Sequence, residues 1–135
     1  MTSWHWISKE ALLLLHAESL AEHGGRAGLR DAGLLDSALN RPLNLVAYGS
    51  PDIADLAASY AVGLAKNHAF VDGNKRAAFL AVGLFLYLND HRLQATKADA
   101  TLTMLGLASG DITEAAFADW LRRHAVATAP PIRGV

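Results

Sequence analysis

Apolar residues recur every three to four positions along most of the chain, the spacing that places them on one face of an α-helix. Residues able to cap a helix precede these segments, and glycine, proline or asparagine follows several of them. Alternating runs of strand length are nearly absent, and only residues 92–95 are compatible with a short extended piece. The pattern predicts six helices, at about residues 9–23, 32–41, 51–67, 74–88, 97–110 and 113–127.

Two of these boundaries depend on proline. The second helix is expected to end near Arg41, because Pro42 follows and proline is unfavourable inside a helix. Ser50 is expected to cap the third helix with Pro51 at its first position, where the missing N–H has no intrahelical partner to lose.

One segment, residues 77–88, is apolar on every side rather than on one face. It is shorter than the roughly 20 residues needed to cross a bilayer, so it is predicted to be a buried helix in the middle of the fold. The fold class is therefore all-α, a bundle of about six helices around a central apolar helix. We expect one domain over residues 1–135, ordered at about 4–127, with a flexible tail that includes Pro130-Pro131.

The composition excludes several functional classes. The 12 basic and 13 acidic residues give a formal net charge of −1, which provides no general attraction to nucleic acid or to an anionic membrane. Cysteine is absent, so disulfides and thiolate metal sites are impossible, in keeping with a reducing cytoplasm. The first ten residues do not form a secretion signal. We expect a cytoplasmic protein that binds neither membrane nor nucleic acid directly.

The chemically distinctive segment is residues 68–76, HAFVDGNKR, directly before the apolar helix. His68 can accept a proton near neutral pH, and the carboxylate of Asp72 is a hard oxygen ligand suited to Mg²⁺. Gly73 and Asn74 form a turn at a helix N-terminus, whose unpaired N–H groups and dipole favour an anion such as phosphate. These are the groups that phosphoryl or nucleotidyl transfer from ATP requires.

The neighbouring residues are assigned supporting roles. Lys75 and Arg76 would compensate phosphate charge, since cations in a first helical turn otherwise oppose the dipole. Phe70 is expected to anchor the loop in the core, and Lys66, just before the histidine, is a further candidate for nucleotide contact. The structural alternatives are a plain loop histidine, an aspartate that only caps the next helix, and solvated cations at a helix end.

The segment resembles the signature of the Fic/Doc superfamily, His-x-Phe-x-Asp/Glu-Gly-Asn-Gly-Arg-x-x-Arg. Two positions depart from it, because Lys75 replaces the second glycine and Phe79 stands at the second arginine. Both departures resemble the Doc branch, the death-on-curing toxins of toxin–antitoxin pairs. Residues 28–35 (GLRDAGLL), 108–112 (ASGDI) and 120–123 (WLRR) also resemble that branch.

The resemblance implies a specific activity and partners. It implies transfer of the γ-phosphate of ATP to a protein hydroxyl, with elongation factor Tu as the target and arrest of translation as the result. It also implies restraint by a Phd-like antitoxin whose disordered tail folds into a groove. The chain lacks the internal Ser/Thr-x-x-x-Glu brake of many Fic proteins, because none of its four glutamates follows serine or threonine at that spacing.

Three other functions remain open at this stage. The first is a Fic-type AMP transferase, and the second is a non-catalytic nucleotide-binding module that keeps the signature for folding. A metal-dependent hydrolase is the third, but His68 and Asp72 alone provide too few ligands for a transition-metal centre.

Overall fold

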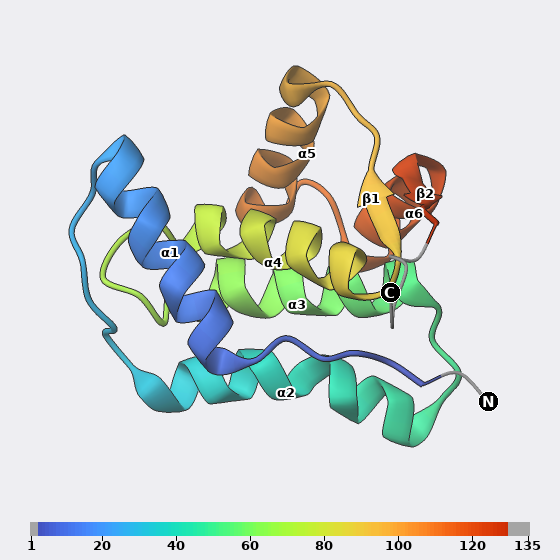
Figure 1. Ribbon diagram of the computed structural model, residues 1–135, viewed down its shortest axis with the longest axis horizontal. Helices are drawn as coiled ribbons and strands as arrows, with labels where there is room; N and C mark the ends of the chain where they lie inside the picture. Colours follow the sequence, from blue (N-terminus) through green and yellow to red (C-terminus); the bar gives the residue numbers. More distant parts are fainter. Residues whose placement is uncertain (1–2, 130–135) are drawn as a thin grey trace, which may run out of the picture.

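The computed structural model describes residues 3–129, and within them the chain forms six helices and one two-stranded sheet (Figure 1). The short strands β1 (His91–Leu93) and β2 (Ala125–Ala127) pair antiparallel, with His91 opposite Ala127 and Leu93 opposite Ala125. The all-α prediction is confirmed. The helices are α1 (Lys9–His23), α2 (Ala32–Tyr48), α3 (Ile53–Asn67), α4 (Asn74–Leu88), α5 (Lys97–Ser109) and α6 (Glu114–His124).

Side-chain caps set the start of five of these helices. In each case the cap accepts a hydrogen bond from the backbone N–H three residues later, which satisfies one of the unpaired donors of the first turn. The capping residues are Ser8, Asp31, Asp52, Thr96 and Thr113. The exception within the described residues is α4, whose N-cap, Gly73, makes no side-chain hydrogen bond.

The structure corrects both boundaries that were predicted from proline. Helix α2 continues through Pro42 to Tyr48. Pro42 is fully buried, and Arg41 beside it donates to the carbonyl of Ser59 in α3, so tertiary contacts offset the lost helical hydrogen bond. Helix α3 is capped by Asp52 rather than by Ser50, because Asp52 and Asp55 form a reciprocal capping box.

The end of the last helix was also predicted wrongly. Helix α6 stops at His124, and the next three residues form β2 instead of a further helical turn. Pairing with β1 supplies their backbone hydrogen bonds, a partner far away in sequence that helical spacing does not reveal. The predicted extended piece exists, but as β1 at His91–Leu93 instead of residues 92–95.

Helix α3 is the most deeply buried helix, and α4 packs along it. The ring of Phe85 in α4 lies 5.2 Å from that of Tyr60 in α3, and Trp4 and Trp6 pack against its other sides. The prediction that residues 77–88 are buried all round is wrong in one respect, because α4 leaves Phe79 and Tyr87 exposed.

Within residues 3–129 no helix is long and apolar enough to cross a membrane. The predicted tail with Pro130-Pro131 lies outside the described residues. The connection between α3 and α4 lies at the same end of the molecule as the connection between α1 and α2 (Figure 1). The signature segment, residues 68–76, comprises this α3–α4 connection and the first three residues of α4.

Candidate active site

His68 terminates α3 in the left-handed conformation, with φ 53° and ψ 47°. This conformation costs a residue with a Cβ about 1–2 kcal/mol, so surrounding contacts must hold it. The side chain is exposed and lines a cleft. The backbone therefore turns sharply at the residue whose imidazole is the candidate base.

Asn74 and Phe70 fix the loop that follows. The side-chain oxygen of Asn74 accepts from the N–H of Phe70, and its amide donates to the carbonyl of Phe70, both at 3.0 Å. The Phe70 ring is 2% exposed and stacks on His16 of α1 at 3.8 Å. Phe70 thus has the position expected of a loop anchor, and Asn74 orders the turn through its side chain.

The N-terminus of α4 is open to the cleft. Gly73 adopts φ 73° and ψ 29°, and the first intrahelical bond at this end runs from the N–H of Ala77 to its carbonyl. The preceding N–H groups have no acceptor within the helix. Lys75 and Arg76 are exposed and form no ion pair with any residue in the described part of the chain. This end of α4 combines a positive dipole end with two cations, the arrangement that binds an anion.

Asp72 is exposed and its carboxylate is held in place by two backbone donors. One oxygen accepts from the N–H of Arg26 at 3.1 Å and the other from the N–H of Gly73 at 2.8 Å. These hydrogen bonds, that of Arg26 first, lower the pKa of Asp72 below its usual value. The carboxylate is therefore ionised at neutral pH.

An ionised carboxylate with a free lone pair on each oxygen fits Mg²⁺, which commonly takes one or two protein carboxylates together with phosphate oxygens. Across residues 3–129 no three His, Asp or Glu side chains converge as a metal-binding group. The donor set therefore fits a nucleotide-bound Mg²⁺ and not a protein-only metal centre.

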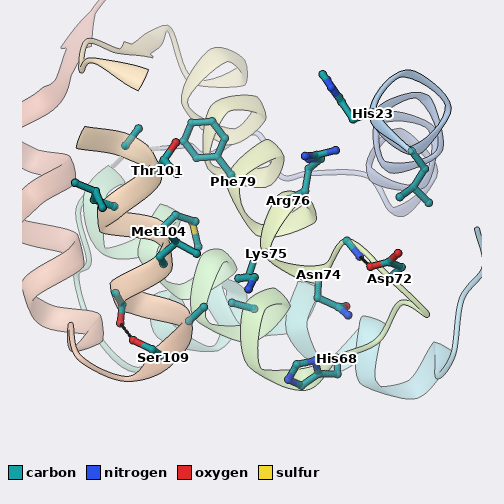
Figure 2. Close-up of a pocket in the computed structure, with 18 of the residues that line it drawn as sticks. His23, His68, Asp72, Asn74, Lys75, Arg76, Phe79, Thr101, Met104 and Ser109 are labelled. Carbon is teal, nitrogen blue, oxygen red and sulfur yellow. Dashed lines mark hydrogen bonds between the residues drawn. The ribbon is translucent and has the colours of Figure 1, made fainter. Parts of the chain in front are cut away.

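These groups line one cleft of about 1080 Å³ between the signature segment, the end of α1 and α5. Figure 2 shows His68 at one end of it, Phe79 beside Thr101 of α5 at the other, and Asn74 and Lys75 between them. The cleft is lined by His68 and by all residues from Asp72 to Arg76, whereas Lys66 is exposed and does not line it. The wall opposite α4 is largely apolar and comes from α5.

Sequence reasoning missed the residues that support this segment from outside. The imidazole of His16, buried in α1, contacts the carbonyl of Asp72 at 2.8 Å. Its place one turn after buried Leu12 is the sequence signal that it faces the core. The guanidinium of Arg30 donates to the carbonyls of His68 and Asn67, and no local pattern indicates that contact.

Comparison with known proteins gives consistent matches. A model of the Fic/DOC family matches residues 6–86, more than half of the 135 residues and the whole signature segment. The chain is 36% identical over 118 residues to Protein kinase doc of Escherichia phage P1, and the aligned region covers 87% of this chain and 93% of that relative. It is 47% identical over 85 residues to Toxin Doc of Mycolicibacterium smegmatis, covering 61% of this chain and 64% of that protein.

Proposed function

The chain belongs to the Fic/DOC family, and we propose that it is a Doc-type toxin that transfers the γ-phosphate of ATP to a hydroxyl of a protein. The observation that carries the proposal is the uncapped N-terminus of α4, with Lys75 and Arg76 in its first turn, lining the same cleft as His68. We propose that the whole chain acts as one Fic/DOC domain in the cytoplasm and that its target is elongation factor Tu.

In the proposed reaction the terminal phosphates lie over the N–H groups that begin α4, beside Lys75 and Arg76. His68 accepts the proton of the attacking hydroxyl as its oxygen bonds to the γ-phosphorus. The bond from that phosphorus to the β,γ-bridging oxygen breaks, and ADP leaves with the electron pair. Asp72 would hold Mg²⁺, which neutralises phosphate charge.

Two side chains favour γ-phosphate transfer over AMP transfer. AMP transfer in the Fic arrangement uses a second arginine that grips the distal phosphates, and Phe79 offers no charge for that purpose. Phe79 is 41% exposed and lies beside Thr101, so it gives that end of the cleft an apolar surface (Figure 2). Lys75 adds an ammonium next to the positive end of the helix dipole. The terminal phosphate of ATP carries the most negative charge, so this position favours it.

The test compares ATP labelled at the γ-phosphate with ATP labelled at the α-phosphate, each incubated with the protein and a bacterial lysate. We expect protein labelling from γ-labelled ATP, with purified elongation factor Tu as an acceptor. His68→Ala should abolish labelling without lowering the melting temperature, whereas His5→Ala, at an exposed histidine outside the cleft, should change neither. Labelling from the α-phosphate alone would refute the kinase proposal.

We also propose that a Phd-like antitoxin tail binds as a helix along the apolar side of the cleft. Phe79, Leu102 and Leu105 expose 41%, 68% and 46% of their surface there, and a set of exposed apolar side chains is typical of a binding groove. Leu105→Asp should weaken binding of the cognate antitoxin at least about tenfold. Leu14→Asp changes a leucine that exposes 62% of its surface and does not line the cleft, so it should have no effect. Equal loss in both variants would contradict this groove.

A further inference from the structure

We propose that Arg30 is a positioning residue that holds the left-handed turn at His68 and so keeps the imidazole in the cleft. Its Nε donates to the carbonyl of His68 at 2.7 Å, and its Nη2 donates to the carbonyl of Asn67 at 3.3 Å. Arg30 lies outside the signature segment, 38 positions before His68 in the chain. The role in catalysis rests on the proposed phosphate transfer, whereas the role in backbone geometry does not.

The turn at His68 needs such support. Helices that end in a left-handed residue usually place glycine there, because glycine alone has no Cβ to clash with the backbone. Within residues 3–129 only His68 and Asp90 are non-glycine residues with positive φ. The last carbonyls of a helix also lack intrahelical donors. The guanidinium donates to the carbonyl of Asn67, the last residue of α3, and to that of His68, the strained residue after it. One side chain thus stabilises both the turn and the helix end.

The backbone around Arg30 positions its side chain for this contact. The N–H groups of Arg30 and Asp31 both donate to the carbonyl of Ala69, at 2.7 and 3.0 Å, and Leu29 forms a β-bridge with Phe70. Residues 28–34 therefore run along the signature loop from Asn67 onward, since the Asn67 amide also donates to the carbonyl of Leu34 at 3.0 Å. The α1–α2 connection and the loop meet at one end of the molecule (Figure 1).

Loss of this contact should affect the reaction rate more than nucleotide binding. The proposed phosphate contacts come from the start of α4, whereas the side-chain hydrogen bonds of Arg30 go to the end of α3 and to His68. The position of the base relative to the attacking hydroxyl, in contrast, depends on the backbone of residue 68. A displacement of about 1 Å in a catalytic group can slow a reaction roughly a hundredfold.

The experiment uses the full chain with Arg30→Ala and, as a control, Arg123→Ala, which removes an exposed arginine of α6 whose side chain makes no hydrogen bond to the described residues. The first readout is the Cα and Cβ NMR chemical shifts of residue 68, which report left-handed backbone geometry without any substrate. The second is the rate of γ-phosphate transfer at varied ATP concentration. The third is the melting temperature.

We expect Arg30→Ala to lose the left-handed shifts at residue 68, to lower kcat at least about tenfold and to change KM for ATP less than about twofold. Arg123→Ala should match the wild type in all three readouts. The proposal is overturned if the shifts at residue 68 persist in Arg30→Ala, if they change without a fall in kcat, or if that variant fails to fold. Absence of phosphate transfer in the wild type would refute the proposed function and the catalytic role of Arg30, while the shifts would still decide whether Arg30 holds the turn.

Discussion

Replacing Gly73 with alanine tests whether the start of α4 must approach α1 as closely as the structure shows. Gly73 has φ 73°, and a Cβ there would lie 3.1 Å from Nε2 of His16 and 3.3 Å from Cδ2 of Leu20. Gly110 ends α5 with φ 90°, but a Cβ at that position would have no neighbour within 4 Å. Gly110→Ala is therefore a matched control that carries the same backbone cost without the steric contact.

The magnitudes follow from these two contributions. A left-handed alanine costs about 1 kcal/mol or somewhat more, which should lower the melting temperature of Gly110→Ala by roughly 4 °C. In Gly73→Ala the crowding against His16 and Leu20 adds about 1–2 kcal/mol, because these two side chains are buried and yield little. We expect a total of about 2–3 kcal/mol and a melting temperature lowered by roughly 10 °C.

Thermal unfolding followed by circular dichroism measures the stability of both variants, and calorimetric titration with MgATP measures binding. Gly73→Ala should bind ATP at least about tenfold more weakly, because relief of the contact moves the N–H groups that begin α4. Gly110→Ala should bind as the wild type does. Equal melting temperatures for the two variants, or unchanged ATP affinity in Gly73→Ala, would refute the reasoning.

Three further predictions concern single side chains. Asn74→Asp removes the amide that donates to the carbonyl of Phe70, so it should destabilise the fold by about 1 kcal/mol and slow phosphate transfer; unchanged chemical denaturation and transfer rate would contradict it. The side-chain hydrogen bond from Arg122 lowers the pKa of Asp52 to about 2. The wild type should therefore have a higher free energy of unfolding than Arg122→Ala, and this advantage should be complete above about pH 4 and vanish as pH falls toward 2. Because this ion pair is half-exposed, the advantage should be only about 1 kcal/mol in urea titrations, and its persistence at pH 2 would exclude the pair as its source. Gly83→Ala, in the interior of α4 with open space at Cβ, should stabilise the chain by about 0.5–1 kcal/mol, and a lowered melting temperature would show that the position is crowded.

Local chemistry explains why most helix boundaries were predictable. Ser8, Asp31 and Thr96 cap helices through residues only three positions away, so their role is visible in a short stretch of sequence. Pro42 shows where that reasoning fails, because its tolerance depends on burial against other elements. Residues 125–127 are a second failure, since their strand exists only through pairing with β1.

The candidate site also has one part that local sequence reveals and another that depends on contacts with distant segments. Residues 68–76 form one local unit, and His68 and residues 71–76 line one cleft, while their chemical roles stay a prediction. Arg30 and His16 contact this unit across 38 and 56 positions of sequence, and nothing near either residue indicates the partner. A sequence pattern thus identifies the groups that face a ligand more readily than the groups that hold them.

The support of the loop by distant segments has a consequence for the order of folding. His16 of α1 and residues 26–31 of the connection before α2 contact the α3–α4 loop. Helices α3 and α4 alone would therefore lack most of the hydrogen bonds that hold this loop. Contacts between positions so far apart form late, because the intervening chain must first be ordered. A newly synthesised chain therefore acquires a formed cleft only when its N-terminal segments have docked, and partial unfolding of α1 should abolish activity before the core melts.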